Sequence, residues 1–120
     1  IFLAGKGPKY PDGRELTGKL GGKITIDQGY EGARQTAINQ LSVLKEMLGD
    51  LNKVKRIVKV LGLVNSSPNF IEQPKVVNGF SDLMVDVFGE KGKHARAAIG
   101  VNSLPRGQAV EIELVVEVYD

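Results

Sequence analysis

The chain has 120 residues, of which 42% are hydrophobic and 25% are charged, the balance of an ordinary globular domain. A net charge of +2, from 16 scattered basic residues, argues against nucleic acid as a partner, and no apolar run approaches membrane-spanning length. The absence of cysteine excludes a disulfide framework and a thiol nucleophile and fits a reducing compartment, so we expect one cytoplasmic domain, residues 1–120.

The chain opens on a short apolar strand, Ile1 to Gly5, without an initiator methionine, and we expect an N-terminal segment to precede it. The next stretch, Lys9 to Lys23, is polar and rich in glycine, and Pro11-Asp12-Gly13 is a turn signal. It contains neither G-x-x-x-x-G-K-[ST] nor G-x-G-x-x-G. We therefore expect a hairpin or an irregular loop here, not a nucleotide-binding loop.

The middle of the chain predicts a helix followed by a central strand. Apolar residues recur at spacings of three and four between Asp27, a suitable N-cap, and Leu48, which Gly49 follows. The run Val54 to Val64 is rich in β-branched residues and apolar on both faces, as in a strand covered on both sides.

A second helix is predicted from Ile71 to Phe88, with Pro74 in its first turn. Asn78 lies on the side of this helix away from its apolar stripe, where an exposed asparagine is the ordinary interpretation. His94 is the only histidine and has no partner at metal-ligand spacing, so neither a metal nor a cofactor is expected.

The last quarter of the chain, His94 to Val118, predicts a β-hairpin around the turn-rich segment 102–108. In its second strand, valine, isoleucine and leucine alternate with Glu111, Glu113 and Glu117. In its first strand, Arg96 shares a face with Ala98 and Gly100, opposite a face of alanine, isoleucine and valine. If both apolar faces cover one core, Arg96 and the glutamates share the other face.

Two interpretations of that face remain open. An arginine above alanine and glycine, with a carboxylate on the adjoining strand, offers room for a small anion. An exposed arginine and glutamate on paired strands are, more ordinarily, a surface ion pair of little energetic weight.

The predicted order is β-(loop or β)-α-β-α-β-β, an α+β sandwich of one mixed sheet with two helices on one face. Two helices cover only one side of this sheet, whereas the central strand is apolar on both. A partner subunit is the simplest cover for the second face.

Three segments carry a resemblance to a known family: Ala95-Arg96-Ala97-Ala98-Ile99, Leu104-Pro105 and Val110-Glu111-Ile112. Together they resemble the signature of the RidA/YjgF family of enamine/imine deaminases, also described as L-PSP endoribonucleases. The likeness extends upstream to Phe2-Leu3-Ala4-Gly5 and covers nearly the whole chain. It implies a chorismate-mutase-like fold assembled as a homotrimer, with clefts between neighbouring subunits.

The resemblance also implies roles for five residues. Arg96 matches the arginine that grips the substrate carboxylate, and Glu111 matches the glutamate that holds the attacking water. Asn78, Ala98 and Gly5 match positions associated with substrate binding, Ala98 standing where many members have a cysteine.

The chain also departs from the family pattern. No tyrosine matches the one that the family uses from its N-terminal segment. His94 replaces the usual proline or alanine, and Asn102 replaces a small or basic residue, which indicates a divergent subgroup.

The implied activity is hydrolysis of a 2-aminoacrylate-type enamine or imine to a 2-keto acid and ammonia. A guanidinium suits the carboxylate, a glutamate suits the water, and no cofactor is required. The alternative is a trimeric module that binds small carboxylates or senses metabolites without turnover. An activity on RNA has no support from motifs, charge or aromatic content.

Overall fold

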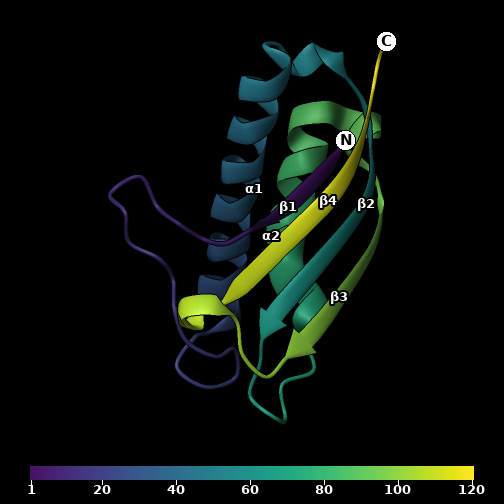
Figure 1. The fold of residues 1–120 in the computed structure, drawn as a ribbon. Coiled ribbons are helices and arrows are strands. Elements are labelled where there is room, and N and C mark those ends of the chain that lie inside the picture. The colour runs from purple at the N-terminus through teal and green to yellow at the C-terminus, as the bar shows by residue number, and fades with distance from the viewer.

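Two helices pack side by side against one face of a four-stranded mixed sheet in the computed structural model, which describes residues 1–120 (Figure 1). In chain order the elements are β1 (Phe2–Lys6), α1 (Ile26–Leu48), β2 (Val54–Asn65), α2 (Gln73–Phe88), β3 (Ala95–Val101) and β4 (Val110–Val118). The predicted α+β architecture is therefore confirmed. Neither helix is both long enough and apolar enough to cross a membrane.

The strand β2 lies inside the sheet, as its apolar sequence predicts. The strand order is β1-β4-β2-β3, in which β2 pairs parallel with β3 and antiparallel with β4. The predicted hairpin is wrong, because β3 and β4 are consecutive in the sequence but β2 lies between them. Residues 102–109 connect them across two strand spacings, roughly 10 Å. A turn-rich segment of this length allows such a crossing as readily as it allows a hairpin.

Arg96 lies on the helix-covered face of the sheet. Its register partner on β2 is Val60, which also pairs with Leu114 of β4, and both partners are buried. Glu111 alternates along β4 with buried residues, so it projects from the open face. The prediction that Arg96 and the glutamates share a face is wrong, because the apolar side of the edge strand β3 is not its core side: Ile99 on that side is 46% exposed.

Both helices begin close to the predicted residues. Thr25, not Asp27, is the N-cap of α1: its hydroxyl accepts a hydrogen bond from the Gln28 N–H at 3.2 Å, and the Gln28 side chain accepts one from the Thr25 N–H at 2.9 Å. This reciprocal pair is a capping box. Asp27 lies in the first turn instead, and α2 begins at Gln73 rather than at Ile71.

The segment between β1 and α1 is an irregular loop, as predicted, and it is anchored to the core. Leu20 is fully buried in a cluster with Val64, Val76 and Val110, and its N–H donates to the Asn65 carbonyl at 2.8 Å. This anchor holds the loop against the end of β2.

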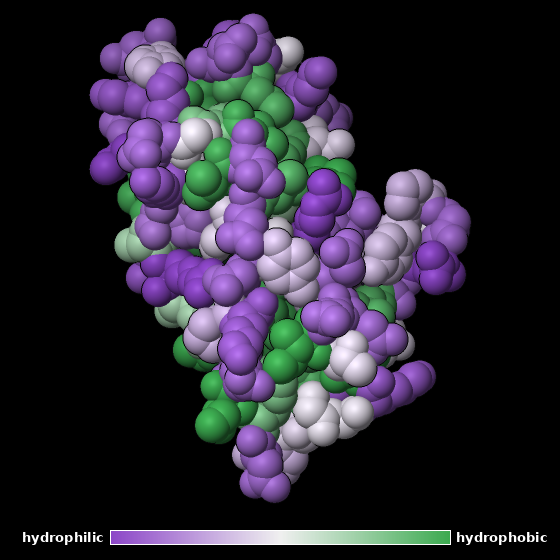
Figure 2. Space-filling view, turned by 180° about the vertical axis from the view of Figure 1, so that it is seen from behind, coloured by the Kyte–Doolittle hydropathy of each residue, from purple (hydrophilic) through white to green (hydrophobic).

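The two faces of the sheet differ in their cover. The helices bury one face with Phe80, Met84, Leu44 and Ala37, and the outer surface on the helix side mixes hydrophilic side chains with smaller hydrophobic patches (Figure 2). On the other face, turned toward the viewer in Figure 1, Phe2 is 87% exposed. This open face also carries a shallow hollow of about 340 Å³, lined mainly by apolar side chains, among them Phe2, Leu61, Ala97 and Val115.

Candidate functional site

Arg96 occupies a small hollow between β3 and α2. Its Nη1 donates to the Ser81 hydroxyl at 3.1 Å and its Nη2 to the Pro74 carbonyl at 3.4 Å. The hollow measures about 250 Å³ and is lined by Ser81, Val85, Lys93, His94 and Arg96. We call this hollow the Arg96 site. Arg96 is half-buried as a residue and its guanidinium forms no ion pair within the chain, so its charge is uncompensated.

His94 completes a chain of hydrogen bonds behind this arginine. Its Nδ1 lies 2.6 Å from the Gly92 carbonyl and its Nε2 lies 2.8 Å from the Ser81 hydroxyl. A carbonyl only accepts, so Nδ1 carries the hydrogen and the free Nε2 of neutral His94 accepts from Ser81. Burial, and to a lesser extent the nearby charge of Arg96, lower the pKa of His94, while the Gly92 carbonyl opposes this.

Two of the predicted binding residues lie on the same side of the sheet as Arg96. Asn78 is half-buried on α2, four residues after Pro74 and three before Ser81, so helical spacing places it on the face that holds the guanidinium. Ala98 follows Arg96 on the same face of β3, where it packs at the margin of the small core cluster. Because β3 is an edge strand, its outer backbone groups are unpaired within the sheet.

Glu111 and Gly5 lie together in a larger cleft of about 910 Å³ beside β1 and β4. A Cβ atom added to Gly5 would lie 2.8 Å from the Glu111 Oε2, so a glycine is needed for the carboxylate to rest at this position. We call this space the Glu111 cleft. Its other walls come from the irregular loop, α1 and the turn before β4, and they include Lys9, Tyr10 and Arg106.

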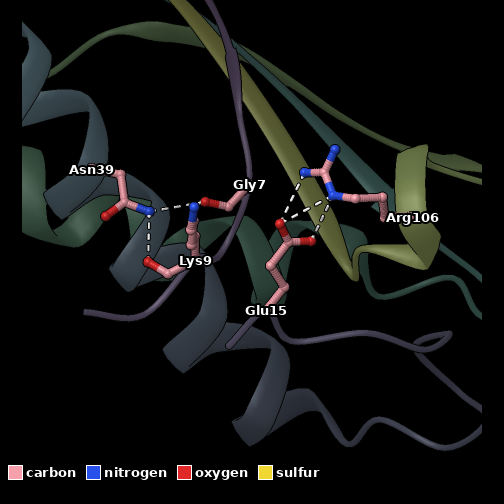
Figure 3. Close-up of polar contacts among 5 residues, drawn as sticks. All are labelled: Gly7, Lys9, Glu15, Asn39 and Arg106. Carbon is pink, nitrogen blue, oxygen red and sulfur yellow. Dashed lines mark hydrogen bonds and ion pairs between the residues drawn. The ribbon is translucent and has the colours of Figure 1, made fainter. Parts of the chain in front are cut away.

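Hydrogen bonds fix the walls of the Glu111 cleft (Figure 3). The Asn39 Nδ2, from α1, donates to the carbonyls of Gly7 and Lys9, both at 3.0 Å. Arg106 forms a forked ion pair with Glu15, in which Nε and Nη2 both lie 3.0–3.1 Å from carboxylate oxygens. Glu15, and more weakly Glu111, raise the pKa of the Arg106 guanidinium.

The structure therefore divides the predicted site residues into two groups. Arg96, Ala98 and Asn78 belong to the helix-covered side, whereas Gly5 and Glu111 belong to the Glu111 cleft. A single chain does not bring the arginine and the glutamate together. Neither location contains a group of three or more histidine, cysteine, aspartate or glutamate side chains arranged to hold a metal ion.

Ser81 and His94 are the site residues that sequence reasoning missed. His94 directly precedes β3 and is two residues from Arg96, so extending the β alternation that groups Arg96 with Ala98 by one step places His94 on that face. Ser81 carried no such signal, because its partners come from another element. Only the packing of α2 against β3 brings it to the arginine.

Comparisons with known proteins bear on the whole chain. A family model described as "YjgF/chorismate_mutase-like, putative endoribonuclease" matches residues 2–118. Protein TCP17 of Trypanosoma cruzi is 48% identical over 118 residues, which cover 98% of this chain and 74% of that protein. The similarity therefore includes both polar locations.

Solved structures agree with this relationship. Protein Atu1372 of Agrobacterium tumefaciens, of unknown function, superposes with a TM-score of 0.95 at 40% identity, covering 98% of this chain and 75% of its own. A "putative endoribonuclease" of Shewanella oneidensis MR-1 superposes with a TM-score of 0.92 at 31% identity, covering 98% of this chain and 78% of its own. Yeast Mmf1 gives a TM-score of 0.61 at 26% identity over 99% of this chain. The chain is thus much closer in shape to the first two than to the third.

Proposed function

Because the chain belongs to the YjgF/chorismate-mutase-like family, we propose that it hydrolyses 2-enamine and 2-imino acids of the 2-aminoacrylate type to 2-keto acids and ammonia. The observation that carries this proposal is the uncompensated charge of Arg96, held at the edge of the sheet by uncharged partners only. The Arg96 guanidinium can therefore bind an anionic group of a ligand.

In the proposed reaction Arg96 holds the substrate carboxylate. A guanidinium has five N–H donors, and the hydrogen bonds to Ser81 and Pro74 use two of them. Three donors remain, enough for a two-pronged contact with a carboxylate. The charge of arginine persists throughout the working pH range, so the anchor does not depend on protonation of Arg96 itself.

The chemical step is addition of water to a C=N bond. The enamine first moves a proton from nitrogen to carbon and becomes the imine. Water then attacks the imine carbon, and its proton passes through a base to the imine nitrogen, which gives a tetrahedral carbinolamine. The hydroxyl proton of this adduct is transferred to the amino group as the C–N bond breaks, so that ammonia leaves and the keto acid remains. Glu111 is the proposed group that orients this water and accepts its proton.

We further propose that the two groups come from different subunits of a homotrimer. Arg96 and Glu111 lie on opposite sides of the sheet, so one subunit contributes the arginine and its neighbour contributes the glutamate. The exposed Phe2 and the apolar hollow on the open face support an assembly in which that face is covered.

The test is release of keto acid from 2-iminobutanoate, generated in situ and followed in a coupled assay. We expect Arg96→Ala to lower kcat/KM by about a hundredfold, because a charge-assisted two-pronged contact is lost. Arg56→Ala is the matched control: its guanidinium is already paired with Glu117 at 2.9 Å and lines neither the Arg96 site nor the Glu111 cleft, so kcat/KM should stay within about twofold of wild type. Equal rates for wild type and Arg96→Ala would refute the assignment.

Binding without turnover is the second candidate, and the separation of Arg96 from Glu111 is the observation that favours it. A chain whose assembly does not join the two groups would hold a small carboxylate and leave it unchanged. Saturable binding of 2-ketobutyrate that depends on Arg96, with no keto-acid release above the uncatalysed rate, would identify this function.

An endoribonuclease activity is the third candidate, since the family description names it. The net charge of +2 and an aromatic content of 6% give little support for RNA binding. A nuclease signal that is lost on further purification would dismiss this candidate.

A further inference from the structure

Ser81 and His94 form a hydrogen-bonded pair that the proposed reaction does not use. The Ser81 hydroxyl touches both the His94 Nε2, at 2.8 Å, and the Arg96 Nη1, at 3.1 Å. The Ser81 hydroxyl therefore connects the titratable imidazole of His94 to the guanidinium of Arg96, the proposed anion-binding group. The pair lines the same hollow as Arg96.

The donors and acceptors of Ser81 can be counted. A hydroxyl has one hydrogen to donate and two lone pairs to accept with. Arg96 only donates, so it fills one lone pair. While His94 is neutral its Nε2 only accepts, because Nδ1 carries the hydrogen bonded to the Gly92 carbonyl. The one hydrogen of Ser81 is then committed to His94.

Protonation of His94 reverses this arrangement. The imidazolium donates from both nitrogens, so Nε2–H now points at the second lone pair of Ser81. The hydroxyl then accepts from both His94 and Arg96, and its own hydrogen is released. The hollow beside it is open and contains the remaining N–H groups of Arg96.

We propose that Ser81 and His94 make the Arg96 site proton-dependent: protonation of His94 turns the Ser81 hydroxyl into a donor for the carboxylate that Arg96 holds. The inference rests on the proposed function, because it requires Arg96 to bind an anion. It adds one binding residue, Ser81, and a regulating residue, His94, that acts through it.

The charged groups around His94 determine the direction of the effect. Arg96, from β3, is the one charge that acts on the imidazole, and it lowers the His94 pKa. Lys93 lines the same hollow, but its ammonium pairs with Glu90 at 2.7 Å. From α2 the hollow receives only the uncharged Ser81 and Val85.

The sign of the coupling follows. A carboxylate bound to Arg96 offsets the positive charge that lowers the His94 pKa, so ligand binding raises that pKa. By reciprocity, protonated His94 binds the carboxylate more tightly than neutral His94 does. Affinity should therefore rise as pH falls through the acidic range in which His94 titrates.

The experiment measures the Kd of 2-ketobutyrate by calorimetry between about pH 5 and pH 8, where the ligand stays ionised. For wild type we expect about tenfold tighter binding at the acidic end, the effect of one added hydrogen bond to a charged group. His94→Gln keeps an acceptor for Ser81 but cannot be protonated, so its Kd should not vary with pH. Ser81→Ala should keep only a clearly weaker pH dependence, that of the Arg96 charge alone, and Ser81→Thr, which keeps the hydroxyl, should restore the full effect.

A second readout uses the imidazole directly. His94 is the only histidine, so its NMR titration is free of overlap. Saturating 2-ketobutyrate should raise the His94 pKa in wild type, and by clearly less in Ser81→Ala. A variant that fails to fold would lose the dispersed spectrum, which separates misfolding from loss of coupling.

The outcomes separate the inference from the proposed function. If wild type binds 2-ketobutyrate through Arg96 but His94→Gln shows the same pH dependence, the inference is wrong and the proposed anchor survives. If wild type does not bind the keto acid, or binds it as well after Arg96→Ala, the anchor fails and the inference fails with it.

Discussion

The chain holds two arginines near polar hollows, and their surroundings differ. Arg106 forms a forked ion pair with Glu15 of its own chain, so its charge is already compensated. Arg96 is held by a hydroxyl and a carbonyl, with no carboxylate of the chain paired to it. The first arrangement ties a turn to a loop. The second leaves a charge available for a ligand.

The carboxylates show the same contrast. Glu15 is only 19% exposed at its side chain and is paired with Arg106, whereas Glu111 has no ion pair and rests over Gly5. The unpaired arginine and the unpaired glutamate lie on opposite sides of the sheet. The ion pairs that a charged residue forms within the chain, more than its residue type, therefore indicate whether its charge is available to a ligand or another subunit.

The largest expected effect comes from mixing two inactive variants. Arg96→Ala and Glu111→Gln should each lose most activity alone, Arg96→Ala by about a hundredfold. Co-refolded in equal amounts, they should recover about a quarter of wild-type activity, because random assembly gives that share of sites with both groups intact. Keto-acid release measures the recovery. A mixture no more active than its components would place both groups of a site on one subunit, or neither group in the reaction.

The next effect concerns the apolar open face. Phe2→Glu should weaken self-association by at least about tenfold, since burying a phenylalanine contributes about 1.5–3 kcal/mol and a buried charge opposes it. Light scattering with size exclusion measures the mass. Met47→Glu is the control, a 56% exposed residue of α1 on the helix side. A wild-type monomer, or an equal response of both variants, would contradict the proposed covering of the open face.

Gly5→Ala tests the position of Glu111. The added methyl group meets the end of a flexible side chain, so we expect the carboxylate to move and kcat to fall by about tenfold, with stability nearly unchanged. Steady-state kinetics and urea unfolding separate the two effects. Gly22→Ala is the control, because a Cβ there meets nothing closer than 3.4 Å. An unchanged kcat would mean that Glu111 does not act from its place over Gly5.

The smallest effect is expected from Asn39→Ala. This change removes two hydrogen bonds that hold the wall of the Glu111 cleft at Gly7 and Lys9. KM should rise by about threefold, because each such bond contributes about 1 kcal/mol and the loop retains its anchor at Leu20. Amide exchange should quicken at residues 7–10, while the NMR titration of His94 stays as in wild type. A shifted His94 titration would show that the two locations are coupled within one chain.

Much of the fold was predictable because local patterns carry it. Short-range rules locate three elements. The spacing of three and four residues before Leu48 predicts α1, the β-branched run from Val54 predicts β2, and glycines at 49 and 89 mark the ends of α1 and α2. The structure has these elements and helix ends at the predicted positions. The sequence pattern predicts Asp27 as the N-cap of α1, whereas Thr25 with Gln28 forms the capping box. Several candidates within one turn satisfy the same rule.

The candidate site was predictable only in part. The family resemblance points to Arg96, Glu111, Asn78, Ala98 and Gly5, and the structure divides them between the helix-covered side of the sheet and the Glu111 cleft. Ser81 gives no signal in the sequence, because a serine on a helix is common and its partners are thirteen and fifteen residues away. Long-range packing leaves no local signal.

The amino-acid sequence by itself determined the elements, their order and the apolar stripes that join them, since these depend on neighbours a few residues apart. Only the tertiary structure decided that β4 enters between β1 and β2, because alternation along a strand does not say which strand lies beside it. The parallel pairing of β3 with β2, which aligns Arg96 with the buried Val60, places Arg96 beneath α2, while the pairing of β4 with β2 leaves Glu111 on the open face. These pairings are the physical reason that the two groups are apart in one chain.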